Sequence, residues 1–247
     1  SAASDVYKRQ QNGVRGGSAT VHFPIWHQEI EDILVLKNNK GTEDNRVRKL
    51  DYSIQISKLF YERFIKDEEI TLFSPHDVPG LYESFGMPEF DELYEKYERS
   101  YKTPKTKIRA QELIGALLKE RAETGRIYIM NIDHCNTHSS FKDKVYMSNL
   151  CQEITLPTTP VQHIDDENGE IALCILSAVN LGLIKDKDDL EELCDLSVRA
   201  LDEIIDYQEY PIVAAQQSAQ SRRSLGIGYI GLAHYLAKNH VAYGDKE

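Results

Sequence analysis

Apolar and polar positions repeat with two different periods along this chain, and the changes of period predict strands interleaved with helices. The segments SATVHFPI (18–25) and RIYIMNID (126–133) are short and rich in β-branched and aromatic residues, which predicts strands. The segment HQEIEDILVL (27–36) instead has helical spacing, with Ile30, Ile33 and Leu34 on one side. Strands that alternate with helices favour an α/β fold with largely parallel strands.

The same periodicities predict the remaining elements. We expect a short strand at EITLF (69–73) and two longer strands over 148–156 and 170–181, which carry few charges and are typical of strands covered on both faces. We expect Gly125 to cap the end of a helix. Further helices are predicted over residues 47–66, 88–101, 105–123, 186–207 and 224–237.

Composition limits the class of protein. The chain has 247 residues, of which 41% are hydrophobic and 28% are charged, as in soluble globular proteins. No apolar run approaches the ~20 residues that span a bilayer, and the start has no signal-peptide pattern, so we expect a cytoplasmic protein without a membrane partner. The net charge of −11 disfavours a nucleic-acid partner, although a local pocket can still bind one small anion.

The two ends of the chain differ from the rest. Residues 1–10 (SAASDVYKRQ) share no periodicity with the residues after them and resemble a non-native leader, so they do not enter the prediction of the fold. The last residues, HVAYGDKE, show neither a helix cap nor a closing strand. We therefore expect an internal fragment of a longer protein.

The stretch SNLCQEITLP (148–157) sets Asn149, Cys151 and Glu153 at alternate positions. On a strand these three side chains share one face. An ionised Glu153 keeps a neighbouring thiol protonated, which disfavours an ordinary thiolate nucleophile. A neutral thiol suits hydrogen-atom transfer, with the carboxylate as base toward a substrate hydroxyl. The alternative is an edge strand with a wet face and an inert cysteine.

The other cysteines fall in predicted elements and show no CxxC spacing, so no disulfide framework is expected. Cys174 lies in the predicted strand 170–181, where it either faces the same substrate as Cys151 or packs as a small apolar residue. Cys194 falls within an amphipathic helix, where we expect a packing role.

The stretch DHCNTHS (133–139) places His134, Cys135 and His138 at near-ligand spacing. Zinc needs a further ligand, and the paired cysteines typical of structural zinc sites are absent. We therefore predict no metal site here and expect these side chains to order a loop by hydrogen bonding.

Two glycine-containing stretches resemble nucleotide-binding patterns. GIGYIG (226–231) fits GxGxxG, but that pattern indicates dinucleotide binding only between a strand and a helix, and we expect it within a helix whose glycines permit close packing. GVRGG (13–17) lets backbone amides approach a phosphate or base, with Arg15 as a donor, or else forms a plain surface turn.

Taken together, these segments resemble the large, catalytic subunit of aerobic class I ribonucleotide reductase, from about Asn12 to Tyr243. The resemblance implies part of a ten-stranded α/β barrel, the fold shared with glycyl-radical enzymes, incomplete at both ends and formed here by residues 11–247 of the catalytic domain. The segments that carry it are NGVRGGSAT, VLKNNKG, NRVRKLDY, TLFSPHDVPGLY, ETGRIYIMNIDHCNTHS, SNLCQEITLPT, DENGEIALCILSAVNLG and RRSLGIGYIGLAHYLA.

The resemblance also implies roles for individual residues. Cys151 matches the cysteine that becomes a thiyl radical and takes the 3′ hydrogen from a ribonucleoside diphosphate, and Glu153 matches the carboxylate that accepts the 3′-hydroxyl proton. Asn149 matches the amide that binds the ribose hydroxyls. Cys174 matches one member of the redox pair that supplies protons and electrons as the 2′-hydroxyl leaves as water, giving a 2′-deoxyribonucleoside diphosphate.

Further contacts and partners are implied by the same resemblance. Leu150, Gln152 and Gly16 join the substrate contacts, and Arg15, Gly16 and Gly17 match the loop that links the specificity effector to the substrate base. No cofactor is expected to bind this fragment directly, because a metal-containing small subunit supplies the radical. ATP and deoxynucleotide effectors, thioredoxin or glutaredoxin as reductant, and a homodimer are expected for the full protein.

The fragment is expected to be inactive alone. The partner of Cys174 should lie upstream, and the phosphate-binding loop, the tyrosines of the radical relay and the terminal cysteines should lie downstream. The alternatives are another barrel radical enzyme, either cobalamin-dependent or of the glycyl-radical type, and a non-catalytic regulatory module that binds nucleotides through GVRGG.

Overall fold

The computed structural model describes residues 16–42 and 46–245, which form two compact units. Unit 1 extends to Pro157 and unit 2 begins at Thr158, and each is described by itself. The predicted leader, residues 1–10, lies outside the described residues.

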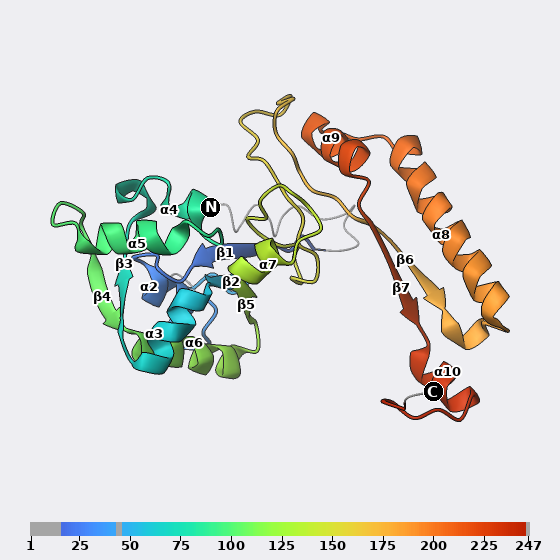
Figure 1. Cartoon of the computed structure of the whole chain (residues 1–247), viewed down its shortest axis with the longest axis horizontal. Coiled ribbons are helices and arrows are strands. Elements are labelled where there is room, and N and C mark those ends of the chain that lie inside the picture. The colour runs from blue at the N-terminus through green and yellow to red at the C-terminus, as the bar shows by residue number, and fades with distance from the viewer. Residues whose placement is uncertain (1–15, 43–45, 246–247) are drawn as a thin grey trace. The chain divides into compact units, whose positions relative to one another are not determined.

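Unit 1 is built on a parallel sheet in the order β1-β2-β5 (Figure 1). The strands are β1 (Thr20–Pro24), β2 (Asp51–Ile56) and β5 (Ile127–Asn131). Both neighbouring pairs are parallel, with Phe23 opposite Ile54 and Ile54 opposite Ile129. The strands predicted over 18–25 and 126–133 and the largely parallel arrangement are therefore confirmed.

The two faces of this sheet differ in polarity. Tyr52, Ile54 and Ile56 alternate with Ser53 and Gln55 along β2, and all five side chains are buried. The register puts Val21, Phe23 and Ile127 on the apolar face, and Thr20, His22 and Tyr128 on the polar face. Parallel strands usually read as continuous apolar runs because helices cover both faces. The alternation here indicates that something polar covers one face.

Helices cover the apolar face and form a single core with it. Phe60, in the helix α3 (Lys58–Lys66), is fully buried in this core and makes edge or tilted ring contacts with Phe85, Phe90 and Tyr94. The antiparallel strands β3 (Glu69–Leu72) and β4 (Thr106–Arg109) pair beside this core. The helices of unit 1 are α2 (Ile30–Leu34), α3 (Lys58–Lys66), the short η2 (Pro75–Asp77), α4 (Leu81–Ser84), α5 (Phe90–Arg99), α6 (Ala110–Thr124) and α7 (Ile132–Thr137).

Unit 2 pairs two parallel strands, β6 (Ile175–Asn180) and β7 (Leu225–Ile230), with the long helix α8 (Lys187–Tyr207) packed along them (Figure 1). Asp186 caps α8 by accepting a hydrogen bond from the Asp189 N–H at 2.9 Å. The predicted helix over 186–207 is thus confirmed. The remaining elements are η3 (Leu181–Leu183), α9 (Val213–Arg222) and α10 (Leu232–Lys238).

The prediction of a helix over 47–66 is wrong in its first half. Residues Asp51–Ile56 form the central strand of the sheet, and only Lys58–Lys66 is helical. Ser57 separates the two with an extended backbone, φ −109° and ψ 170°. Strand pairing on both sides of β2 outweighs the helix propensity of a short segment.

The prediction of a helix over 224–237 is wrong in the same way. Leu225–Ile230 pairs in register with β6, and only Leu232–Lys238 is helical. The close packing of the two strands explains why position 226 is a glycine, because a Cβ there would lie only 2.5 Å from Leu176 Cδ2. Gly226 does permit close approach, but between strands, whereas nothing lies within 4 Å of a Cβ built on Gly228.

The helices predicted over 88–101 and 105–123 correspond to α5 and α6, although Thr106–Arg109 is the strand β4. Gly125 ends α6 with φ +65°, so the predicted cap is confirmed. Within the described residues the strands form three separate sheets and no closed barrel. None of the helices in residues 16–42 and 46–245 combines the length and apolar character needed to cross a bilayer.

Candidate functional site

The segment predicted as the strand 148–156 is a loop, and this is the main correction to the predicted site. A turn runs through Leu150–Gln152, where the Gln152 N–H donates to the Asn149 carbonyl at 3.2 Å. Gln152 has φ +66°, in the left-handed region that ends an extended backbone. Asn149, Cys151 and Glu153 therefore do not alternate along a β-strand.

Asn149 closes this loop by pairing with Ile154. The Asn149 N–H donates to the Ile154 carbonyl at 3.2 Å, and the Ile154 N–H donates to Asn149 Oδ1 at 3.0 Å. The Ser148 hydroxyl donates to the Ile154 carbonyl at 2.7 Å. Such side-chain to backbone bonds offer the chain an alternative to a strand ladder.

The loop lies against the polar face of the unit 1 sheet. Thr20 Oγ1 on β1 donates to the Leu150 carbonyl at 2.6 Å, and Gln55 Nε2 on β2 donates to the Tyr146 carbonyl at 2.5 Å. Both residues belong to the face that the register defines as polar. The polar side chains of β2 thus find their hydrogen-bond partners in the loop that carries Cys151.

Gln152 makes a third attachment, through its side chain. The buried Ser53 hydroxyl donates to Gln152 Oε1 at 2.6 Å, and Gln152 Nε2 donates to the Ile129 carbonyl at 2.6 Å. One amide therefore joins the loop to both β2 and β5.

Cys151 and Glu153 flank Gln152, and both side chains are exposed. Desolvation and then the charges of Cys151, Asp51 and Glu153 raise the pKa of the Tyr128 hydroxyl on β5. The loop thus presents both predicted catalytic groups at exposed positions, one on each side of Gln152.

The sequence did not predict the three residues that support the loop, Thr20, Ser53 and Gln55. A signal was present in DYSIQI (51–56), where polar and apolar residues alternate strictly. That pattern is typical of a strand with one polar face, although the segment falls within the helix predicted over 47–66.

The oxygen end of the Asn149 side-chain amide already accepts a hydrogen bond within the loop. Its Oδ1 accepts from the Ile154 N–H at 3.0 Å, which fixes the orientation of the amide. The Nδ2 end is then the one available to donate to a ligand. Asn149 therefore both shapes the loop and offers a donor beside Cys151.

Cys174 lies in unit 2, immediately before β6, and is half-buried. Its neighbour across the strand pair is Gly226, where a Cβ would lie 3.2 Å from the Cys174 sulfur. A glycine at this position leaves room for the sulfur. The prediction that Cys174 faces the same substrate as Cys151 stays a prediction, since the two residues belong to different units.

The glycine loop is described only in part. Arg15 lies outside the described residues, whereas Gly16 and Gly17 lead into β1 without regular structure. Nothing lies within 4 Å of a Cβ built on Gly16. Their predicted role toward a substrate or an effector stays a prediction.

The DHCNTHS stretch forms the short helix α7 rather than a loop. The rings of His134 and His138 meet edge to face at 5.5 Å. Cys135 packs against the core, and burial raises the pKa of its thiol, which disfavours a thiolate ligand. Among the described residues, no three His, Cys, Asp or Glu side chains converge as a metal site requires.

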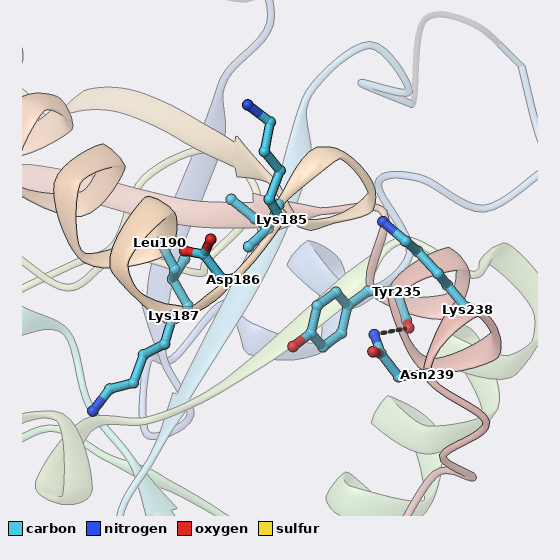
Figure 2. Close-up of a pocket in the computed structure, with 8 residues that line it drawn as sticks. Lys185, Asp186, Lys187, Leu190, Tyr235, Lys238 and Asn239 are labelled. Atoms are coloured by element: carbon cyan, nitrogen blue, oxygen red, sulfur yellow. Dashed lines mark hydrogen bonds between the residues drawn. The ribbon is translucent and has the colours of Figure 1, made fainter.

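Gly226 and Gly228 lie within β7, and only Gly231 stands at the junction between β7 and α10. The first two glycines therefore do not form the turn after a strand that a phosphate-binding loop requires. Unit 2 does have a hollow of about 350 Å³ between the start of α8 and α10, shown in Figure 2. Lys187 points away from it and pairs with Glu191 at 3.4 Å. The residues that line the hollow include three lysines and Asp186 but no cysteine.

Comparison with known proteins agrees with these features. Residues 4–247 match the family described as ribonucleotide reductase, barrel domain. The chain is 60% identical to the ribonucleoside-diphosphate reductase subunit alpha of Buchnera aphidicola from Schizaphis graminum, covering 98% of this chain, and 61% identical to that of Haemophilus influenzae, covering 95%. It is 58% identical over 95% of its length to the subunit alpha of ribonucleoside-diphosphate reductase 1 of Escherichia coli.

In each of these relatives the chain spans 32% of the relative's own length. The parallel α/β architecture and the family match, which covers almost the whole chain, lead to the same conclusion. The chain belongs to the ribonucleotide reductase barrel-domain family.

Proposed function

We propose that this chain carries part of the catalytic centre of a ribonucleoside-diphosphate reductase alpha subunit, which reduces ribonucleoside diphosphates to 2′-deoxyribonucleoside diphosphates. The observation that carries the proposal is the loop tip, where Cys151 and Glu153 are exposed on either side of Gln152, whose side chain is anchored to the sheet. The names of the relatives support the same reaction. The two parallel sheets would be arcs of the ten-stranded barrel, which further protein would complete.

In this proposal the residues divide the reaction between them. The thiyl form of Cys151 takes the 3′ hydrogen atom, and Glu153 accepts the proton of the 3′-hydroxyl. The Nδ2 end of Asn149 donates to a ribose hydroxyl. The 2′-hydroxyl leaves as water after it gains a proton from the dithiol of Cys174 and its partner, whose two electrons reduce the sugar. The hydrogen atom then returns from Cys151 to the 3′ carbon.

The proposal includes partners outside this chain. A metal-containing small subunit supplies the radical, and thioredoxin or glutaredoxin restores the dithiol. Gly16 and Gly17, with Arg15, are proposed to contact the substrate or to connect it with a nucleotide effector, and ATP or deoxynucleotides would act on the full protein, a homodimer. Holding thiol, base and ribose in one enclosed place lowers the barrier by proximity.

The test is Cys151→Ser in the full-length alpha subunit, assayed for deoxynucleoside diphosphate formation with its small subunit and a dithiol reductant. We expect a loss of roughly 10³-fold or more, because serine does not form the sulfur radical. Cys194→Ser, on the exposed side of α8, is the matched control and should retain activity. Persistent reduction by Cys151→Ser would favour a regulatory role for this region.

A further inference from the structure

Gln152 separates the two reactive residues of the loop, yet its own side chain turns toward the sheet. Its Oε1 accepts from the Ser53 hydroxyl and its Nε2 donates to the Ile129 carbonyl, both at 2.6 Å. Only one orientation of the amide satisfies a hydroxyl donor and a carbonyl acceptor together. The side chain is therefore fixed at both ends, against two different strands.

The backbone of Gln152 explains why such an anchor matters. Its φ of +66° is uncommon for a residue with a side chain, and such conformations persist where surrounding contacts determine them. This turn sets the directions of Cys151 before it and of Glu153 after it. If the amide is released, the turn can relax toward an ordinary conformation and change the direction of both side chains.

The other attachments of the loop differ from this one in kind. Thr20 and Gln55 bind the backbone carbonyls of Leu150 and Tyr146, which any sequence provides. The bond between Ser53 and Gln152 joins two side chains, and Ser53 is fully buried beneath the loop. This pair is thus a part of the support that substitutions can remove without altering the reactive groups.

We infer that Gln152 is a positioning residue, held by Ser53, that fixes the relative direction of the Cys151 thiol and the Glu153 carboxyl. The inference rests on the proposed function and deepens it, because it names the device that aligns the hydrogen-atom acceptor with the base. Neither Ser53 nor the amide of Gln152 takes part in bond making. Their effect is on the fraction of bound substrate that is aligned for reaction.

A double-mutant cycle in the full-length alpha subunit tests this. Ser53→Ala and Gln152→Leu should each lower kcat about tenfold, the equivalent of one buried hydrogen bond, while KM for the ribonucleoside diphosphate stays within about twofold. The kcat of the double variant should be no lower than that of the less active single variant, because the two changes remove the same interaction. Losses that multiply, or a kcat for Ser53→Ala within about twofold of wild type, would overturn the inference.

Ser57→Ala provides the matched control. Ser57 is also buried and immediately follows β2, but its hydroxyl makes no hydrogen bond within the described residues. Its kcat should equal that of the wild type. Thermal unfolding of each variant shows whether a loss of kcat accompanies a loss of fold.

Gln152→Glu gives a second readout that does not depend on Ser53→Ala folding. The introduced carboxylate can accept from Ser53, but its other oxygen faces the Ile129 carbonyl, which raises the pKa of that carboxyl. Its protonated form can donate to Ile129 as the amide does. The kcat of Gln152→Glu relative to wild type should therefore rise several-fold as pH falls from about 8 to about 6. A ratio independent of pH would contradict positioning by the amide.

These outcomes are separable from those of the proposed function. Activity of the Cys151→Ser subunit would contradict the proposed function itself. An inactive Cys151→Ser subunit together with a fully active Ser53→Ala subunit leaves the reaction in place and removes only the positioning role of Gln152.

Discussion

Units 1 and 2 bury apolar surface to very different extents. Unit 1 has one continuous core that joins the sheet, its helices and an aromatic cluster around Phe60. Within residues 158–245, by contrast, Leu176, Leu183 and Leu196 are 63%, 75% and 50% exposed. Large exposed apolar surface is typical of regions that contact further protein. The loop with Cys151 is attached to the unit that supplies a rigid support by itself.

This difference suits the proposed chemistry. Hydrogen-atom transfer and proton abstraction need two groups in fixed relative positions, and sites on rigid elements hold such positions best. Three strand residues, Thr20, Ser53 and Gln55, attach the loop to a sheet whose other face is the core. Cys174, the proposed redox residue, lies instead in unit 2, which has more exposed apolar side chains.

The largest expected effect comes from the core of unit 1. Phe60→Ala should destabilise the 247-residue chain by about 3–5 kcal/mol, because it opens a cavity among three aromatic rings. Leu196→Ala, at a half-exposed position of α8, should cost well under about 1 kcal/mol. Denaturant unfolding followed by hydrogen exchange in each unit measures both changes. Equal losses of stability would show that unit 2 has a core of comparable strength.

A smaller effect is expected from the ion pairs. Glu98 accepts from Arg63 at 2.6 and 2.7 Å and from Thr71 at 2.5 Å, with both charged side chains mostly buried. Glu98→Gln keeps one acceptor oxygen and should therefore cost about 1.5–3 kcal/mol, the contribution of a hydrogen bond to a charged group. In unit 2 the Arg223–Asp206 pair, 2.9 Å long, is exposed, and Asp206→Asn should have a slight effect that vanishes in high salt. If the loss of stability in Glu98→Gln also vanished in high salt, the two ion pairs would not differ in burial as described.

The same pair predicts an acid dependence of unit 1. Burial works to raise the pKa of Glu98, but hydrogen bonds from Arg63 and Thr71 outweigh it, so the pKa lies below its ordinary value of 4.5. A carboxyl with a lowered folded pKa stabilises the fold above its unfolded pKa and loses that contribution as pH falls through the folded value. Stability of unit 1 should thus decrease below about pH 4.5, and Glu98→Gln should flatten that decrease.

The smallest effect on stability is expected at the open face of unit 2. Leu176→Asn should change the free energy of unfolding by less than about 0.5 kcal/mol, since the side chain is 63% exposed. It should nevertheless reduce the fluorescence of a bound hydrophobic dye. Ile65→Asn, 77% exposed on α3, is the control and should leave dye binding unchanged. Equal reductions of dye fluorescence in both variants would show that the face around Leu176 binds the dye no better than the surface around Ile65.

Local pattern was sufficient for the elements with strong periodicity. The stripe of α8, the apolar runs of β1 and β5, and Gly125 after α6 are each determined by neighbouring residues in the sequence. The pattern failed at β2 and β7, because both are short segments that become strands through pairing with partners distant in the sequence. Segments of that length carry too little local preference to resist their surroundings.

The candidate site was also predicted only in part from the sequence. The spacing of Asn149, Cys151 and Glu153 predicted a reactive site on a strand, and the site itself stays a prediction. The predicted backbone was wrong, because alternate polar residues fit a closed loop as well as a strand with one polar face. The left-handed conformation of Gln152 and the pairing of Asn149 with Ile154 decided for the turn.

What the sequence determined by itself was therefore the family to which its segments are similar and the residue types that the loop carries. Only the tertiary structure decided how the loop is held. The Ser53 hydroxyl and the Gln152 amide are 99 positions apart in the chain. No local pattern links two such residues, because their contact depends on which strands pair and on which face of the sheet the loop lies against.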